Sequence, residues 1–157
     1  MRRSDREITD REEILQVMRK CDVCRLALND DGYPYIIPLN FGLDADENGI
    51  RLYFHSALTG TKLDLIAHDP RASFEMDCGH ELKYYEEQCE CTMAYESVIG
   101  RGTIRILPEE EKVAALKLLM AHYHAGSDLP FSPAVVPRTA VYCLTVESLT
   151  GKRRRLK

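Results

Sequence analysis

The chain lacks several features that would assign it to common classes of protein. No apolar run approaches the ~20 residues that a membrane-spanning helix needs, and the charged start MRRSDREITDREE has no apolar segment of a secretion signal after it. No internal repeat and no low-complexity tract is present. The net charge of −4 argues against a general nucleic-acid binder. We therefore expect a cytoplasmic protein whose partners include neither a membrane nor a nucleic acid.

Length and composition indicate one folded domain. The chain has 157 residues, of which 45% are hydrophobic and 29% are charged, which is the composition of a soluble globular protein. This length is sufficient for one hydrophobic core and too short for two full domains. We therefore treat residues 1–157 as a single domain.

Six cysteines are present, and in a cytoplasmic protein we expect free thiols rather than disulfides. Cys21-x-x-Cys24 and Cys89-x-Cys91 suggest a split zinc site, but the second pair lacks the usual two-residue gap and Cys24 falls in a strand-like alternation. Core packing explains Cys21 and Cys143. We expect no metal, and a reactive role stays open for Cys89 and Cys91.

The first third of the chain predicts a helix followed by three antiparallel strands. Thr9 and Glu12 form a capping-box pattern ahead of an apolar helical face. Segments 23–28 and 33–43 flank a turn that ends in glycine, which predicts a hairpin. A second polar turn leads into a strand through Phe54, so the three strands are expected to form a meander.

The rest of the chain alternates strands with a few helices. The expected elements are a helix beginning near Lys62, a strand over 72–77, an irregular polar segment over 78–89, one bent strand or two over 89–107, a helix opened by Pro108, a loop over 126–138 and a last strand over 139–147. The apolar face of the helix after Pro108 is expected to contain Val113, Leu116, Leu119 and Met120. Because no regular βαβ alternation is present, the pattern favours a mainly β (α+β) antiparallel barrel with flanking helices over a Rossmann sheet.

The segment LYFHSALTGTKLDL, residues 52–65, predicts a buried strand, a hydroxyl-rich loop and the start of a helix. Ser56, Thr59 and Thr61 offer hydroxyl groups, and Lys62 adds a cation where the helix begins. Exposed amides at a helix start favour anions, so this loop is a candidate phosphate site. It is not a Walker A loop, because the pattern GxxxxGK[ST] is absent. The alternative is an ordinary turn before a surface helix.

The order of these elements and four local motifs resemble the FMN-binding split-barrel proteins related to pyridoxamine 5′-phosphate oxidase, and within them the nitroimidazole-resistance (Nim) group. The motifs are YPYIIPLNF at 33–41, LYFHSALTGTKLDLI at 52–66, YESVIGRGTIRIL at 95–107 and LTGKR at 149–153. The resemblance implies an antiparallel split β-barrel that binds FMN at the interface of a homodimer.

The resemblance also implies which residues hold the cofactor. The strand along the isoalloxazine ring corresponds to Ile37, Pro38, Leu39 and Asn40, and the phosphate-binding set corresponds to His55, Ser56, Thr61 and Lys62. Ser97 and Val98 correspond to the contribution of the second subunit, and Lys152 to a residue that closes over the flavin. The alternatives are a plain buried strand at 37–40, an ordinary serine beside a core valine, and a solvated basic tail around Lys152.

The function implied is an FMN-dependent oxidoreductase that moves electrons from NAD(P)H or a protein donor to a small planar acceptor such as a 5-nitroimidazole. His55 is the candidate catalytic residue, because the Nim group places a histidine here near cofactor and substrate; a phosphate ligand and a structural strand residue are the alternatives. Vitamin B6 oxidation is not expected, since Tyr35 and Asn40 stand where that enzyme has basic residues. The rival functions are a flavin- or haem-binding sensor or carrier without turnover, and a zinc-stabilised interaction module.

Overall fold

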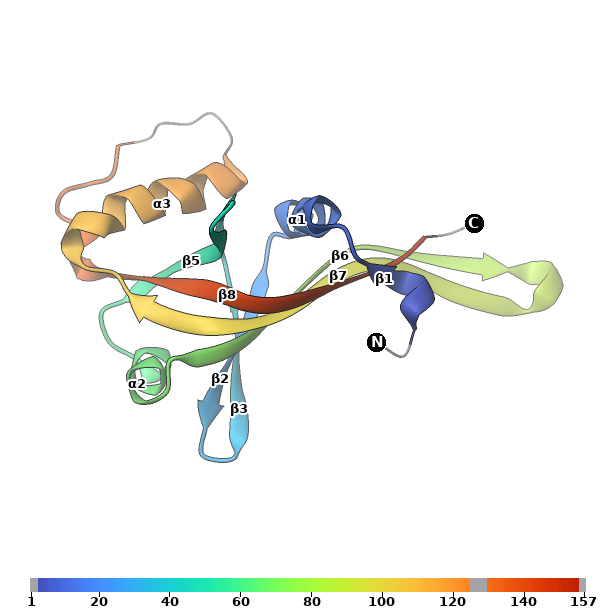
Figure 1. The fold of residues 1–157 in the computed structure, drawn as a ribbon, viewed down its shortest axis with the longest axis horizontal. Helices are drawn as coiled ribbons and strands as arrows, with labels where there is room; N and C mark the ends of the chain where they lie inside the picture. The colour runs from blue at the N-terminus through green and yellow to red at the C-terminus, as the bar shows by residue number, and fades with distance from the viewer. Residues whose placement is uncertain (1–2, 125–129, 156–157) are drawn as a thin grey trace.

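The computed structural model describes residues 3–124 and 130–155, which form a strongly bent antiparallel sheet of eight strands with helices on its faces (Figure 1). The strands are β1 (Glu7–Ile8), β2 (Cys24–Asp30), β3 (Tyr33–Leu39), β4 (Gly42–Asp46), β5 (Gly49–Ala57), β6 (Arg71–Tyr85), β7 (Glu90–Ile106) and β8 (Thr139–Arg154). Their order across the sheet is β3-β2-β6-β7-β8-β5-β4, and β1 pairs with the end of β8.

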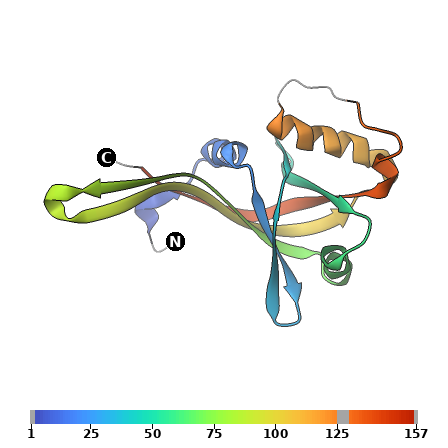
Figure 2. The same cartoon turned by 180° about the vertical axis from the view of Figure 1, so that it is seen from behind.

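Three α-helices and three short 3₁₀ turns complete the described fold. They are α1 (Arg11–Lys20), α2 (Thr61–His68), α3 (Glu109–Tyr123), η1 (Ser4–Arg6), η2 (Glu86–Gln88) and η3 (Val136–Arg138). α1 packs against β6 and β7, α2 against β2, and α3 against β4 and β5, as seen from behind in Figure 2. None of these helices is long and apolar enough to cross a membrane.

The predicted β2–β3 hairpin is confirmed. Asp31 and Gly32 both have positive φ, 35° and 88°, so the two-residue turn matches the twist of the strands on either side. The predicted meander is wrong, however, because β3 ends at Leu39 and β4 lies at the opposite end of the sheet. The chain crosses over at Phe41, whose side chain is buried and whose N–H donates to the Tyr123 hydroxyl of α3 at 3.0 Å.

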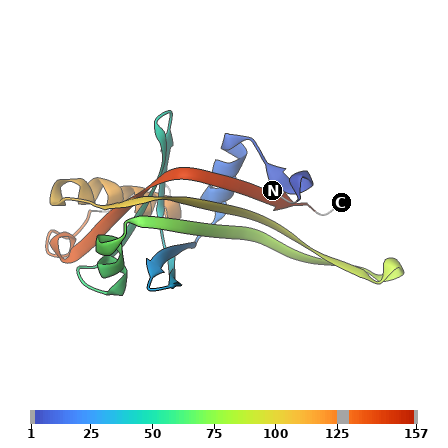
Figure 3. The ribbon, with the colours of Figure 1, turned by 60° about the horizontal axis from the view of Figure 1, so that its bottom comes forward.

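β6 and β7 form a long hairpin that projects beyond the barrel (Figure 3). We call its outer part, residues 78–96, the arm. The expected irregular segment over 78–89 is wrong, since β6 continues to Tyr85 after a register shift between Cys78 and Glu81. β7 is one continuous strand, and β8 extends beyond the predicted 139–147 to Arg154.

The ends of the helices correct two details of the sequence analysis. Asp10, not Thr9, is the N-cap of α1, and its carboxylate accepts a hydrogen bond from the Glu13 N–H at 2.9 Å. α3 begins after Pro108 as predicted. Its buried residues include Leu116 and Leu119, whereas Val113 is 41% exposed.

The hydrophobic core has two parts. The larger part fills the barrel and continues beneath α1, with Leu26, Leu52, Phe54, Phe74 and Leu144 among its fully buried side chains. A smaller cluster lies beneath α3 and includes Cys143, as the sequence predicted for that thiol. At Gly42 a Cβ atom would lie 2.6 Å from the Leu119 amide nitrogen, so α3 rests directly on the β4 backbone.

Candidate functional site

The loop between β5 and α2 is built around Gly60. This residue has φ 140° and ψ 158°, a conformation that is essentially restricted to glycine, and a Cβ atom here would meet nothing within 4 Å. Its carbonyl accepts hydrogen bonds from the N–H groups of Leu63 and Asp64 at 2.9 and 3.3 Å. No side chain caps the helix. The first amides of α2, at Thr61 and Lys62, therefore remain available to a ligand.

His55 and Lys62 lie close enough to influence each other electrostatically. Burial lowers the pKa of Lys62, and burial together with the charge of Lys62 lowers the pKa of His55 below its ordinary 6.5. Within residues 3–124 and 130–155, no carboxylate forms an ion pair with Lys62. A partly desolvated cation without a counter-charge at a helix start is an environment that an anion would stabilise. The sequence expectation of an anion site in this loop thus has a consistent electrostatic basis.

The hydroxyl groups of the loop differ in their surroundings. Ser56 Oγ donates to the Ala57 carbonyl at 2.9 Å, and its lone pairs remain free to accept. Thr61 is exposed at the first position of α2. Both residues are at the same end of the barrel as His55, because β5 leads directly into the loop.

β3 is an edge strand, since its described partner is β2 alone. Ile37 and Leu39 are half-buried and pack against the core, which matches the alternative of a plain buried strand for their side chains. Pro38 and Asn40 are exposed on the other face, and Asn40 Nδ2 donates to the Asp22 carbonyl at 3.4 Å. The free edge of β3 therefore offers main-chain groups and small apolar surfaces to a flat ligand.

Ser97, Val98 and Lys152 lie in a different part of the chain. Ser97 pairs across the sheet with Lys152, whose Nζ lies 5.7 Å from the centre of the Tyr95 ring, so Lys152 belongs to a strand and not to a solvated tail. The Val98 side chain is fully buried in the core of its own chain.

These residues are distant from the β5–α2 loop. His55 pairs with Val141 on β8, eleven positions before Lys152 on the same strand. At 3.2–3.4 Å per residue, this separation amounts to about 35–37 Å of strand. One chain therefore does not bring the two predicted sets together.

The cysteines do not form one cluster. Cys21 and Cys24 are buried in the core, whereas Cys89 and Cys91 are exposed on the arm. All six thiols are free, and among the described residues no group of three or more potential metal ligands is present. The described geometry does not support the split zinc site that the cysteine spacing suggests.

Sequence reasoning missed the cluster of cations around Tyr95. Arg6 from η1 and Lys152 from β8 both act on the Tyr95 side chain of β7. Burial acts to raise the pKa of Tyr95, but the hydrogen-bonding capacity and charge of Lys152 and Arg6 outweigh it and lower the pKa below its ordinary value. Three distant segments meet here because β8 pairs with both β7 and β1, so no local sequence motif could have revealed the cluster.

The bent antiparallel sheet with its flanking helices defines a split β-barrel of the α+β class. Residues 10–153 match the sequence model of the pyridoxamine 5′-phosphate oxidase family, and the chain therefore belongs to this family.

Three proteins illustrate what this chain is similar to in sequence or in fold. A candidate 5-nitroimidazole antibiotic resistance protein of Bacteroides thetaiotaomicron is 30% identical, with a TM-score of 0.82 over 94% of this chain and 86% of that one. The FAD- and haem-binding protein of Mycobacterium smegmatis has a TM-score of 0.84 at 19% identity, over 96% of this chain and 74% of that one. An uncharacterised protein of Rhizobium meliloti is 24% identical over 155 residues, 92% of this chain and 93% of its own.

Proposed function

We propose that this protein is a homodimeric flavoprotein that binds FMN and transfers electrons from a reduced donor such as NAD(P)H to a small planar acceptor of the 5-nitroimidazole type. The observation that carries the proposal is the partly buried Lys62 beside His55 at the start of α2, which forms no ion pair with a carboxylate of the described residues. The similarity to a candidate nitroimidazole resistance protein and to FAD-binding proteins supports it.

The residues of the loop fit the phosphate of FMN. Lys62 would neutralise part of its charge, and the Thr61 and Ser56 hydroxyls with the first amides of α2 would hydrogen-bond its oxygens. The absence of a capping side chain at Gly60 leaves this end of the helix open for such a ligand. The bound flavin would supply the redox chemistry.

The remaining residues would position the ring and the acceptor. The free edge of β3 at 37–40 would lie along the ring, and its main-chain groups would contact the polar side of the ring system. Because its pKa is lowered, His55 is neutral at neutral pH, and its imidazole can therefore either donate or accept a hydrogen bond near the acceptor.

The separation of the two predicted sets favours a site that two chains share. Lys152 and its cross-strand partner Ser97 lie about 35–37 Å along β8 from Val141, the residue that pairs with His55. A second copy could bring its own Ser97 and Lys152 to the loop of the first. The proposed dimer therefore has two equivalent flavin sites.

Replacement of Lys62 tests the cofactor site. Lys62→Ala should weaken FMN binding by about 1.5–3 kcal/mol, the contribution of a hydrogen bond to a charged group, whereas riboflavin, which lacks the phosphate, should bind both proteins equally. Isothermal titration calorimetry measures both affinities. Lys117→Ala, which removes an exposed lysine from α3, is the matched control. Equal FMN affinity in the Lys62→Ala and Lys117→Ala variants would exclude Lys62 from the phosphate site.

Turnover separates an enzyme from a flavin carrier. FMN-loaded protein is mixed anaerobically with NADPH and a 5-nitroimidazole, and loss of the nitro absorbance is followed. Catalytic loss of this absorbance is the expected result. Stable flavin binding without reduction of any acceptor would favour the sensor or carrier function instead.

A further inference from the structure

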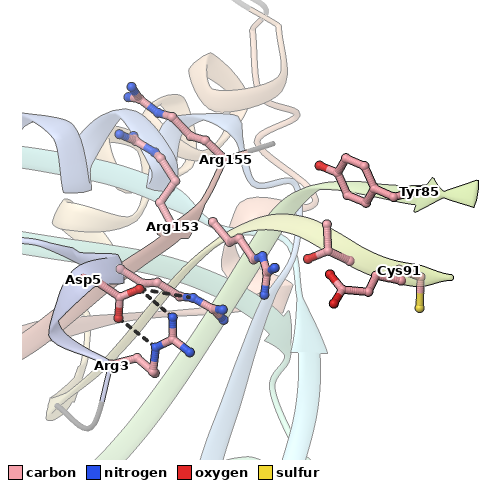
Figure 4. Close-up of a pocket in the computed structure, with 10 residues that line it drawn as sticks. Arg3, Asp5, Tyr85, Cys91, Arg153 and Arg155 are labelled. Carbon is pink, nitrogen blue, oxygen red and sulfur yellow. Dashed lines mark hydrogen bonds and ion pairs between the residues drawn. The ribbon is translucent and has the colours of Figure 1, made fainter. Parts of the chain in front are cut away.

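A second candidate binding site lies between the two ends of the described chain and the arm. It is a pocket of about 440 Å³ that we call the arginine pocket (Figure 4). Its cations are Arg3, Arg6 and the run Arg153, Arg154 and Arg155, and Tyr85 and Cys91 of the arm form the facing wall. None of the residues assigned above to FMN lines it.

The charge of this pocket is opposite to that of the whole molecule. Its lining contains five arginines and only two acidic residues, Asp5 and Glu90, whereas the chain as a whole has a net charge of −4. Walls of one sign around a concave surface focus the electric field and concentrate ligands of the opposite sign. The pocket is therefore suited to an anion.

Two of the five arginines already have close partners. Arg3 makes a two-pronged contact with Asp5, at 2.7 and 2.6 Å. Arg153 bridges Glu13 of α1 and Glu96 of β7. Because Arg153 points to the α1 side of β8, strand alternation directs Arg154 to the opposite side, the side of its cross-strand neighbour Tyr95.

The other arginines lack such compensation. Arg154 and Arg155 have no ion pair with any residue that the structure describes. The Arg6 side chain is only 18% exposed, yet its nearest carboxylate oxygen, on Asp5, is 4.0 Å away. A guanidinium that is largely removed from water without a close counter-ion is stabilised by a bound anion. Lowering of the Tyr95 pKa by Lys152 and Arg6 reports the same positive environment.

The volume of the arginine pocket and the aromatic ring in its wall indicate a ligand larger than an inorganic ion. A volume of about 440 Å³ falls within the range of sites for whole organic ligands. Tyr85 provides an aromatic ring whose surroundings already include a cation, Lys83 Nζ at 5.1 Å from the ring centre. Planar guanidinium groups bind phosphate oxygens in pairs, and aromatic rings stack on nucleobases.

We propose that the arginine pocket binds a nucleotide, with Arg6 and Arg154 on its phosphates and Tyr85 beside its base. None of the lining residues belongs to the set assigned to the flavin. Because Lys152 of that set directly precedes Arg153 in β8, competition between FMN and ADP distinguishes the two sites. A free nucleotide and a nicotinamide dinucleotide both carry phosphate groups that these arginines can bind, so the experiment has to distinguish between the two ligands.

Calorimetry on the full chain with ADP, adenosine, inorganic phosphate and NADPH tests the proposal. ADP should bind, adenosine and inorganic phosphate should each bind at least about tenfold more weakly, and a higher salt concentration should weaken ADP binding. NADPH binding as tight as ADP binding would identify a dinucleotide as the ligand, and ADP binding alone would identify a free nucleotide. Either result supports a nucleotide site.

Variants locate the binding. Arg154→Ala should weaken ADP binding by about tenfold or more while flavin content stays unchanged, whereas Arg138→Ala, an exposed arginine in η3, should bind ADP like the parent. Tyr85→Leu should weaken the binding of ADP but leave the binding of inorganic phosphate unchanged. Absence of ADP binding at millimolar concentration, equal affinity in the two arginine variants, or displacement of ADP by FMN would each overturn the proposal.

Discussion

The charge of His55 depends on its surroundings. Burial and the neighbouring Lys62 both lower its pKa below 6.5, so the folded chain holds a neutral imidazole at neutral pH. As the pH falls below 6.5, the unfolded chain takes up this proton more readily than the folded chain, and His55 then lowers the stability of the fold. Above pH 6.5 both forms are neutral, and this contribution vanishes.

A bound phosphate should reverse the shift. We expect FMN to raise the pKa of His55, because a dianion between His55 and Lys62 favours the protonated imidazole. Riboflavin should leave this pKa nearly unchanged. NMR titration of the histidine ring protons, assigned with His55→Gln, measures both values. If FMN binds and the pKa stays below 6.5, the phosphate lies elsewhere.

Tyr142 carries a different kind of buried polar group. Its side chain is fully buried, its ring stacks on Phe54 at 5.6 Å, and no described residue hydrogen-bonds its hydroxyl. Because a buried hydroxyl without a partner costs about 1–3 kcal/mol, we expect Tyr142→Phe to leave the free energy of unfolding unchanged or to raise it by about 1 kcal/mol. Urea denaturation measures the difference.

Tyr123 provides the matched control for this substitution. Its hydroxyl donates to the Asp22 carbonyl at 2.8 Å and accepts from the Phe41 N–H at 3.0 Å. Tyr123→Phe should therefore lower stability by about 1–3 kcal/mol, because the buried Phe41 N–H loses its partner. A loss of the same size in Tyr142→Phe would indicate that its hydroxyl is satisfied.

At the scale of elements, two glycine substitutions distinguish a role of the β5–α2 junction in FMN binding from a general loss of stability caused by backbone strain. Gly60 and Gly32 both have positive φ and open space where a Cβ would lie. Alanine at either position should cost about 1–3 kcal/mol of stability. Gly60→Ala should in addition weaken FMN binding by at least about fivefold, since it moves the first amides of α2. Equal FMN affinity in the two variants would argue against a role for this helix start.

Local signals explain which elements the sequence revealed. The β2–β3 hairpin follows from Asp31-Gly32, whose positive φ values are a property of the turn itself. The β6 half of the arm, beyond Cys78, escaped prediction because the arm is a two-stranded ribbon outside the core, with Leu82 and Tyr84 exposed. Without a buried face, a strand shows no alternation of apolar and polar residues.

The two candidate sites also differ in whether a local sequence signal reveals them. The loop from His55 to Lys62 is contiguous, so its hydroxyl groups, glycine and lysine are visible together in the sequence. The arginine pocket combines η1, the arm and the end of β8, and the pairing of β8 with both β7 and β1 places these segments side by side. Long-range pairing of this kind has no short sequence motif.

At the scale of the whole molecule, the proposed dimer makes assembly and cofactor binding interdependent. We expect sedimentation to report about twice the 17.9 kDa chain mass, and FMN to shift any residual monomer towards dimer. Ser97→Arg should reduce dimer and flavin content together, because it adds a bulky charge at the proposed contact. Ser132→Arg, in an exposed loop, is the control. A flavin-loaded monomer would contradict the shared site.

The two outer strands of the sheet also determine how copies can meet in concentrated solution. β3 contains Pro34 and Pro38, which have no amide hydrogen to offer a newly added strand. β4 has only five residues, and two of them, Asp44 and Asp46, carry carboxylates. Both edges thus resist extension by backbone pairing, the step from which fibrils grow. The protein can therefore associate through its faces without extending the sheet at β3 or β4.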